Sequence, residues 1–545
     1  MKRLFQYFRW LYRYSEGARS ALLGNILLGV ATVALNLIFI WMCKSLVDIA
    51  THVRTGAIGW YTAAVLIVIG LRLICSALTM RLENITTAKM NFLIRKRIYA
   101  DLLGSQWTGK EKFHSGDTLN RLMNDVDKVT QVICTEFPTM VTTLVQLVAA
   151  FVFFCLLEWR LALLLILISP AFLAFAKLFF RRMHGITKDI RDTESRIQSH
   201  IQESLQHRNV IRSLETGEIM RERLDDLQEA EYEQILDRTR FNIFSRTVIG
   251  ATFSLGYIAA FLWGVYGILN GSVTFGVMTA FLQLVGQIQS PLLRLTRQIP
   301  AFVYATASID RLAELEEAPQ EEEGEPIMLE GTCGIRVEKL SFRYPDGEEN
   351  IFRDFSFDFA PGSRTAIVGE TGVGKSTLIR LMLALLRPVG GLLKLYNEQL
   401  EEVEISARTR RNLVYVPQGN SLFSGTIREN LLLGDPEADE ARLKEVLHCA
   451  AADFVLELPD GLETLCGEQG SGLSEGQAQR IAIARALLRP GSILLLDEFS
   501  SSLDPATEER LMERLTAAAP DKTMIFITHR EKIAQYCTGT LSLER

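Results

Sequence analysis

Hydrophobic and polar positions divide this chain into two parts with different periodicity. The first part contains six apolar runs, each close to the length of about 20 residues that crosses a bilayer. Burying all six in a water-soluble protein would need a larger apolar core than one chain of this length builds. We therefore predict an all-α, six-helix transmembrane domain. Its spans lie at about residues 21–43, 57–80, 132–157, 161–180, 248–269 and 273–293.

The connections between the apolar runs alternate in length and charge. The first, third and fifth links are short, whereas the second and fourth are long, polar and helical in pattern. Lys and Arg concentrate in the N-terminus and in the two long connections. By the positive-inside rule, both termini and both long connections are cytoplasmic. We expect a multi-pass integral membrane protein with long intracellular helices, placed in the inner (plasma) membrane if the source is bacterial.

After about residue 330, short apolar runs alternate with helical patterns, as in a parallel-sheet α/β domain. A Glu-rich stretch with Pro319 and Pro326 precedes it and indicates a solvated boundary. Residues 1–20 alternate basic and aromatic side chains, which favours a helix at the membrane interface, although an ordinary surface helix has the same pattern. The predicted domains are an interfacial helix (1–20), a transmembrane domain (21–312), an acidic linker (313–330) and an α/β domain (331–545).

Composition narrows the functional classes. Of the 545 residues, 48 % are hydrophobic and 22 % charged, and the net charge of −6 argues against a nucleic-acid partner. The eight cysteines form no C-x-x-C pair, so we interpret them as reduced structural thiols and expect no zinc site. The lipid bilayer is therefore the partner that composition itself predicts.

A few polar residues interrupt the apolar runs. Ionisable groups at membrane depth usually face a bundle interior or a watery cavity, which makes Arg72 and Glu136 candidates for lining a pathway. For Glu136 and Lys177, both near span ends, snorkelling to the interface is the alternative. The glutamines of the last span suit interhelical hydrogen bonds at least as well as substrate contact. These are Gln283, Gln287 and Gln289.

A glycine-rich motif, GETGVGKST at residues 369–377, organises the second part of the chain. It follows an apolar strand-like run and precedes a helical pattern, the context that a phosphate-binding loop requires. Its backbone N–H groups would surround phosphate oxygens, Lys375 would neutralise the β- and γ-phosphates, and Ser376 would coordinate Mg²⁺. We predict that ATP contacts Gly369, Glu370, Thr371, Gly372, Val373, Gly374, Lys375, Ser376 and Thr377.

Three further strand ends carry the chemistry of phosphoryl transfer. The apolar run 492–496 ends in Asp497, a predicted Mg²⁺ ligand, and Glu498, which would polarise the attacking water. Another apolar run ends in His529, a potential donor to the γ-phosphate. Gln418 would sense Mg²⁺ and the attacking water. We predict catalytic roles for Glu498, His529 and Gln418, with Ser376, Gln418 and Asp497 around the metal.

Tyr344 follows an earlier strand-like run in the same domain. Its ring would stack on the adenine base, although an aromatic residue at a strand edge is an equally good interpretation.

Residues 473–477 (LSEGQ) and 479–486 (QRIAIARA) resemble the signature loop and helix of ATP-binding cassette (ABC) ATPases. The resemblance extends to the membrane half, where residues 115–126, 203–215 and 273–283 are similar to intracellular and sixth-span segments of ABC exporter half-transporters. It implies an α/β P-loop ABC ATPase domain at 331–545 and two nucleotides held between two chains. Ser474 and Gly476 would contact the γ-phosphate in trans, and Gln477 would belong to the same nucleotide-binding set. Asp504, also a predicted nucleotide-binding residue, would lie in the loop through which the two cassettes communicate.

Glu475 departs from the family pattern, which has a glycine at this position. A carboxylate beside the γ-phosphate would weaken binding unless the side chain points outward. Because the other motif residues are present, we expect both sites of a homodimer to be competent, with a heterodimeric partner as the alternative. Residues 467–470 resemble the segment that touches the opposite membrane domain in exporters.

Taken with the resemblance, these motifs predict an ATPase whose hydrolysis drives export of an amphipathic substrate, with ATP and Mg²⁺ as cofactors. A lipid, a drug or a peptide is compatible with the apolar spans. The alternative function is a membrane-embedded, ATP-gated or regulatory protein that uses the same cassette without pumping.

Overall fold

The computed structural model describes residues 9–10, 12–107, 115–157, 159–322, 324–345, 347, 349–467 and 472–544. The chain forms two compact units. Unit 1 contains Met1–Tyr99 and Gly116–Leu315, and unit 2 contains Ala100–Ser115 and Glu316–Arg545. Of the predicted N-terminal helix, residues 1–8 and 11 lie outside the described part, and residues 12–14 are helical.

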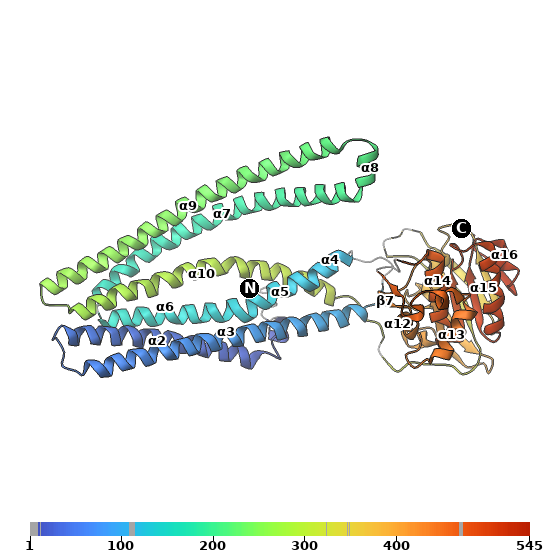
Figure 1. The fold of residues 1–545 in the computed structure, drawn as a ribbon, viewed down its shortest axis with the longest axis horizontal. Coiled ribbons are helices and arrows are strands. Elements are labelled where there is room, and N and C mark those ends of the chain that lie inside the picture. The colour runs from blue at the N-terminus through green and yellow to red at the C-terminus, as the bar shows by residue number, and fades with distance from the viewer. Residues whose placement is uncertain are drawn as a thin grey trace. The chain divides into compact units, whose positions relative to one another are not determined.

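Every regular element in the described residues of unit 1 is a helix, and the long helices run beside one another (Figure 1). Helices α7 and α9 are joined by the short α8 and form a long hairpin. The elements are α2 (Arg19–Ala50), α3 (Ile58–Leu103), α4 (Ser115–Asn120), η1 (Arg121–Asp125), α5 (Val126–Gln131), η2 (Val132–Glu136), α6 (Phe137–Leu157), α7 (Trp159–Gln206), α8 (Arg208–Ser213), α9 (Gly217–Leu269) and α10 (Phe275–Glu316).

Four helical segments in the described residues are long and apolar enough to cross a membrane: Arg19–Ala50, Ile58–Leu103, Gly116–Leu157 and Gly217–Leu269. They contain the predicted spans 21–43, 57–80, 132–157 and 248–269 almost completely. The predicted spans 161–180 and 273–293 fall mainly in α7 and α10, where some side chains lie outside the described part. Large apolar side chains on these helices are exposed, as lipid contact requires.

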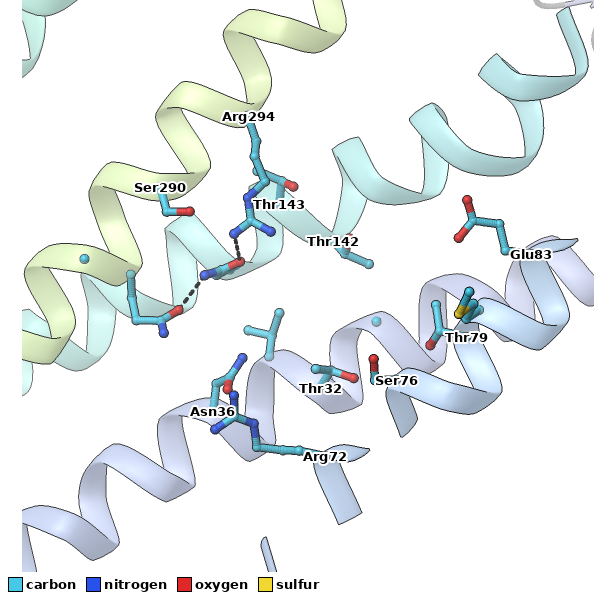
Figure 2. A pocket seen from close by; sticks show the side chains of 16 residues that line it. Thr32, Asn36, Arg72, Ser76, Thr79, Glu83, Thr142, Thr143, Ser290 and Arg294 are labelled. Carbon is cyan, nitrogen blue, oxygen red and sulfur yellow. Dashed lines mark hydrogen bonds between the residues drawn. The ribbon is translucent and has the colours of Figure 1, made fainter. Parts of the chain in front are cut away.

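A cavity of about 460 Å³ lies between α2, α3, α6 and α10 (Figure 2). Arg72 lines it, as predicted from its position within an apolar run, and so do Gln146 and Gln287. Glu136 is not among the described residues that line it, and the side chain of Lys177 lies outside the described part. The membrane helices therefore enclose a polar space.

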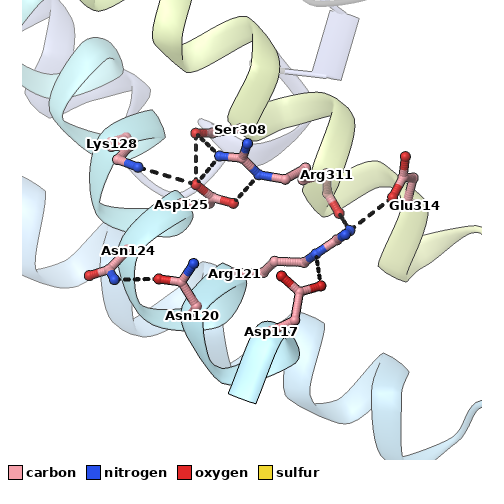
Figure 3. A network of polar contacts seen from close by, with 9 residues as sticks. All are labelled: Asp117, Asn120, Arg121, Asn124, Asp125, Lys128, Ser308, Arg311 and Glu314. Atoms are coloured by element: carbon pink, nitrogen blue, oxygen red, sulfur yellow. Dashed lines mark hydrogen bonds and ion pairs between the residues drawn. The ribbon is translucent and has the colours of Figure 1, made fainter. Parts of the chain in front are cut away.

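Two short π-helical turns, η1 and η2, interrupt the helical segment from α4 to α6. Such turns insert an extra residue into the helical repeat and often occur at functional positions. Asp125, at the end of η1, is 1 % exposed. Its carboxylate accepts hydrogen bonds from Arg311 Nε (2.7 Å), Arg311 Nη2 (2.6 Å) and the Ser308 hydroxyl (2.9 Å), as Figure 3 shows. The charged hydrogen bonds from Arg311 offset the desolvation cost of burying this carboxylate.

A second arginine extends this network toward the end of α10. The Arg121 guanidinium donates to Asp117 Oδ2 and Glu314 Oε2, both at 2.9 Å, and to the Arg311 carbonyl oxygen (Figure 3). Glu314, which belongs to the predicted acidic linker, is therefore helical and ion-paired here. The network fixes residues 117–125 to the C-terminal part of α10.

A close backbone approach joins the end of α2 to the start of α10. The Asp48 carboxylate is buried, pairs with Lys44 at 3.1 Å and accepts a hydrogen bond from the Gly276 N–H at 3.2 Å. A Cβ at position 276 would lie 2.4 Å from Asp48 Oδ1, so only glycine fits. The carboxylate also sits at the N-terminus of α10, where the helix dipole favours negative charge.

Unit 2 contains the parallel sheet that the alternating pattern predicts, β11-β3-β10-β9-β6. It also contains an antiparallel sheet, β2-β1-β4-β5, which the pattern did not predict. β7 and β8 form a separate two-stranded antiparallel sheet. The strands are β1 (Cys333–Phe342), β2 (Phe352–Phe359), β3 (Arg364–Val368), β4 (Gly390–Asn397), β5 (Glu402–Glu404), β6 (Leu413–Val416), β7 (Gly425–Thr426), β8 (Leu465–Cys466), β9 (Ile493–Asp497), β10 (Thr523–Ile527) and β11 (Gly539–Ser542).

Helices pack on the parallel sheet, and most begin where the sequence supplies a cap. Thr426 and Glu429 form a capping box for α12, and Asp439 caps α13 by accepting the Arg442 N–H. The helical elements are α11 (Lys375–Met382), η3 (Ala407–Asn412), α12 (Ile427–Leu432), α13 (Glu440–Cys449), η4 (Asp453–Glu457), η5 (Gly461–Glu463), α14 (Glu475–Leu487), α15 (Pro505–Ala518) and α16 (Glu531–Ala534).

The end of α3 belongs to unit 2. Ser105 forms a bridge with Gln320, and the Gln106 N–H donates to the Pro319 carbonyl oxygen at 2.6 Å. The Trp107 ring packs on the core beneath the antiparallel sheet, under the Arg380 guanidinium. This segment precedes residues 115–126, which the family resemblance singled out and which mainly lie in unit 1. One continuous helix thus runs from the membrane region into unit 2.

The Asp125 network generates a stability prediction. We expect Asp125→Asn to lower the stability of unit 1 by about 2 kcal/mol, because the two charge-assisted hydrogen bonds from Arg311 to a buried carboxylate weaken. The matched control is Asp237→Asn, which removes an exposed carboxylate paired with Arg240 at 3.5 Å. Thermal unfolding in lipid nanodiscs should show a lower midpoint for the first variant only. Equal midpoints for both variants would contradict the assigned role of the network.

Candidate functional site

The phosphate-binding loop connects the end of β3 to the start of α11. Gly374 caps α11 with φ +109°, and Gly369 has φ +153°. A Cβ at Gly374 would lie 2.5 Å from Ile351 Cγ2, and one at Gly369 would lie 2.5 Å from the Leu543 carbonyl oxygen. Both positions therefore require glycine for space as well as for backbone conformation. The predicted strand–loop–helix context is present.

Lys375 begins α11 and reaches back across the loop. Its ammonium donates to the carbonyl oxygens of Gly369 (2.6 Å) and Glu370 (2.9 Å). Burial lowers the pKa of Lys375, while the nearby carboxylates of Glu498 and Asp497 oppose that shift. The loop carbonyls hold the ammonium over the loop, beside the two carboxylates.

Parallel register brings the other motif residues to the same edge of the sheet. Ile527 pairs with both Ile367 and Asp497, and Val416 pairs with Leu496, so that four strands end together. In open α/β sheets this carboxyl edge is where ligands bind. The residues that follow β6, β9 and β10 therefore meet the phosphate loop.

Glu498 lies between the two other predicted catalytic residues. Gln418 Nε2 donates to Glu498 Oε2 at 2.6 Å, and His529 Nε2 lies 3.3 Å from Glu498 Oε1. Glu498 has φ +46°, an unfavourable value for a side chain of its size. Its backbone is held by the Ile527 carbonyl oxygen and by the Gln479 side chain. The sheet and α14 thus fix the direction of this carboxylate.

The residues predicted to hold Mg²⁺ fit a hard cation. Burial raises the pKa of Asp497, a shift that the Ser376 hydroxyl opposes by hydrogen bonding, and Tyr415 donates to Asp497 Oδ2 at 3.4 Å. Within the described residues, Asp497 Oδ1 is buried without a hydrogen-bond partner. Oxygen donors from a hydroxyl and a carboxylate are the ligands that Mg²⁺ prefers. An unpaired buried oxygen beside Ser376 suits such a cation.

Tyr344 lies close to the phosphate loop. Its hydroxyl is 3.1 Å from Thr377 Oγ1 and within 3.4 Å of Arg380 Nη1, and its ring packs edge-on against Phe342. The tyrosine therefore meets α11, as a residue near the nucleotide would. Whether its ring stacks on adenine stays a prediction.

The signature residues form a second cluster at the start of α14. Ser474 and Gln477 make a capping box, with Gln477 N–H donating to Ser474 Oγ at 3.2 Å and Ser474 N–H donating to Gln477 Oε1 at 2.9 Å. Gly476 is buried, and a Cβ there would lie 2.8 Å from the Ser502 carbonyl oxygen. Glu475 is exposed in the first helical turn, where a carboxylate favours the helix dipole. Of the two glycine positions in the family pattern, packing within this chain therefore requires glycine only at the second, Gly476. The first, occupied here by Glu475, accepts a side chain.

Asp504 caps α15 by accepting the N–H groups of Ala506 and Thr507. The sequence did not predict Arg530, which follows His529 and donates to the carbonyl oxygens of Ser501 and Leu503. It also pairs with the buried Glu508 at 3.0 Å. The sequence gives no sign that Arg530 holds the loop before α15, because its partners lie more than 20 residues away in the chain.

A further link that sequence reasoning missed joins α14 to the loop after Gln418. The Arg485 guanidinium donates to the Ser421 hydroxyl at 2.8 Å and to its carbonyl oxygen at 3.1 Å. Burial lowers the pKa of Arg485. Of the predicted segment 467–470, residues 468–470 lie outside the described part.

The two signature positions yield opposite predictions. We expect Gly476→Ala to lower the thermal midpoint and the ATPase rate, because its methyl group would collide with backbone at Ser502. Glu475→Gly removes an exposed side chain, so it should change the KM for ATP by less than about threefold and cost about 1 kcal/mol of helix stability at most. Steady-state kinetics and melting of both variants test this. The two roles would be contradicted if Glu475→Gly changed the KM for ATP strongly while Gly476→Ala kept the wild-type ATPase rate and thermal midpoint.

Comparison with known proteins agrees with this geometry. Residues 22–292 match the family model of the ABC transporter transmembrane region, and residues 352–501 match a family model described as ABC transporter. A putative multidrug export ATP-binding/permease protein of Bacillus subtilis is 28 % identical over 453 residues, covering 82 % of this chain and 77 % of the relative. A protein of the same description from Staphylococcus aureus is 27 % identical over 450 residues, covering 82 % and 78 %.

Among solved structures, a bacterial Atm1-family ABC exporter with ATP bound has the same fold. Its TM-score is 0.79 at 22 % sequence identity, and the match covers 96 % of this chain and 93 % of that one. Both halves of the architecture are thus matched, in the same order and in one polypeptide. The chain belongs to the ABC transporters, as an integral membrane protein whose ATP-binding domain is an ATPase coupled to transport.

Proposed function

We propose that this protein uses ATP hydrolysis to export an amphipathic substrate across the membrane. The observation that supports this most directly is the position of Glu498, held between Gln418 and His529 at the carboxyl edge of the parallel sheet. The relatives described as multidrug export proteins support export as the direction of transport.

In the proposed reaction, water attacks the γ-phosphate in line while the β–γ phosphoanhydride bond breaks. Glu498 orients the water and accepts its proton, and His529 donates a hydrogen bond to the γ-phosphate. Lys375 exchanges the loop carbonyls of Gly369 and Glu370 for phosphate oxygens. Mg²⁺, held by Ser376 and Asp497 with Gln418 nearby, would offset the phosphate charge.

The protein is proposed to work as a dimer, with a homodimer as the first expectation and a heterodimer as the alternative. Ser474, Gly476 and Gln477 make their internal contacts at the start of α14 and would cover a nucleotide held by the other chain. The turn around α8 exposes Leu205, Val210 and Leu214, which are 69 %, 51 % and 65 % exposed. An apolar turn of this kind suits contact with a second chain.

Transmission of force to the membrane helices is proposed to use the segment Ala100–Ser115. Its described part packs within unit 2, where Trp107 meets Arg380, one turn from Thr377 on α11. The same helix α3 continues into the membrane region without a break. Movement of α11 on nucleotide binding would therefore act on α3 directly. Both termini and unit 2 are proposed to be cytoplasmic, where ATP is available.

The proposal predicts the kinetics of Glu498→Gln. We expect ATP turnover in nanodiscs to fall by about 10²- to 10⁴-fold, because the amide cannot accept a proton from water. ATP affinity should stay within about threefold of wild type, since the phosphate loop is unchanged. Phosphate release and equilibrium binding of a fluorescent ATP analogue separate the two quantities.

The matched control is Glu437→Gln, an exposed glutamate in a loop of the same unit. It should hydrolyse ATP at the wild-type rate. Turnover by Glu498→Gln at the rate of this control would refute the assigned role of Glu498. ATP-dependent opening that only lets solute run down its gradient would support the gated alternative instead of a pump.

A further inference from the structure

The cavity between α2, α3, α6 and α10 has polar walls although apolar helices surround it. Apart from Gly29, Val33, Met80 and Gly286, every residue that lines it has a polar side chain. On α2, α3 and α10 the polar residues recur at intervals of three and four positions and so share one face. The α3 face carries Arg72, Ser76, Thr79 and Glu83, and the α10 face carries Gln287, Ser290 and Arg294.

A hydrogen-bonded chain positions one arginine at the cavity wall. Arg294 Nη2 donates to Gln146 Oε1 at 2.9 Å, and Gln146 Nε2 donates to Gln287 Oε1 at 2.5 Å (Figure 2). Gln146, which is 9 % exposed, thus uses both ends of its amide to orient the guanidinium. Because a guanidinium has five N–H donors, most of those of Arg294 stay available to a ligand.

The second arginine faces the cavity from the opposite wall, where Figure 2 shows Arg72 beside Asn36. Its guanidinium carbon lies 5.4 Å from the centroid of the Phe39 ring. Within the described residues, no carboxylate pairs with Arg72 or with Arg294. A charge at membrane depth is costly unless it meets a counterion or water. Each guanidinium therefore favours an anion or water in the cavity.

The carboxylate that lines this cavity, Glu83, lies far from Arg72 along α3. Glu83 is eleven residues beyond Arg72 on α3, which corresponds to about 16 Å along the helix axis. The end of the cavity near Arg72 and Arg294 is thus positive, with amide and hydroxyl groups around it. A guanidinium binds carboxylate and phosphate oxygens more strongly than it binds neutral groups.

We propose that this cavity binds the anionic head, a carboxylate or phosphate, of an amphiphile, through Arg72 and Arg294, which line its opposite walls. The proposal rests on the proposed export function and names its substrate class. The volume suits a drug-sized molecule or the head of a larger one.

Binding can be measured without nucleotide, in nanodiscs of phosphatidylcholine that contain the full chain. The probe is radiolabelled dodecyl phosphate, with unlabelled dodecyl phosphate, dodecyltrimethylammonium, inorganic phosphate and phosphatidylglycerol as competitors. We expect competition by dodecyl phosphate and little by the cationic amphiphile. Competition by phosphatidylglycerol would identify the anion source as a membrane lipid, and its absence would identify a single-chain amphiphile; either result supports the proposal.

Variants locate the site. Arg72→Gln and Arg294→Gln should each weaken binding of dodecyl phosphate about tenfold, whereas Arg72→Lys should retain most of it. Glu83 lines the same cavity, and Glu83→Gln removes its negative charge. This variant should therefore bind dodecyl phosphate as tightly as wild type or more tightly. Arg208→Gln, an exposed arginine on α8, is the control for charge alone. Thermal midpoints of all variants show which of them remain folded.

Three results would overturn the proposal: equal competition by the cationic amphiphile, equal competition by inorganic phosphate, or losses in Glu83→Gln as large as those in the arginine variants. The assay reads binding whether or not ATP is hydrolysed. Failure of the export function would therefore appear as absent ATP-driven transport with binding retained, and failure of this proposal as absent binding by a protein that hydrolyses ATP.

Discussion

The parallel pairing of β3, β10, β9 and β6 is the constraint on which the ATPase site depends. It places the ends of four strands at one edge, so that the phosphate loop, Asp497, Glu498 and His529 meet although they are far apart in sequence. Within that edge, the Gln418–Glu498 hydrogen bond and the unfavourable backbone of Glu498 fix one carboxylate direction. A change of one residue in strand register would move the side chains that follow to other positions and separate the group.

Contacts between distant segments connect this edge to the rest of the protein. Arg485 ties α14 to the loop after Gln418, and Arg530 holds the loop before α15. Trp107 brings the end of α3 against Arg380 on α11. In unit 1, the Asp125 network fixes the π-helical turn to α10. Guanidinium groups recur in these links because their several donors can hold two segments at once.

The sequence was informative where chemistry is local. The apolar runs predicted the membrane helices, and the glycine pattern and the apolar strands ending in polar residues predicted the second domain. The structure adds that Glu475 is tolerated in an exposed turn whereas Gly476 is not replaceable. Partners such as Arg530 with Ser501, or Asp48 with Gly276, were beyond prediction because they depend on tertiary approach between distant residues. The positive end of the membrane cavity likewise arises only when two helices bring Arg72 and Arg294 to one space.

The central claim is that hydrolysis at this edge moves substrate against its gradient. The most direct test is uptake by sealed proteoliposomes in which unit 2 faces outward, with an amphiphile that stimulates ATP turnover. The account predicts accumulation inside above the outside concentration, dependent on ATP and magnesium, and absent with Glu498→Gln. Equilibration without accumulation, or equal accumulation by the Glu498→Gln protein, would contradict it.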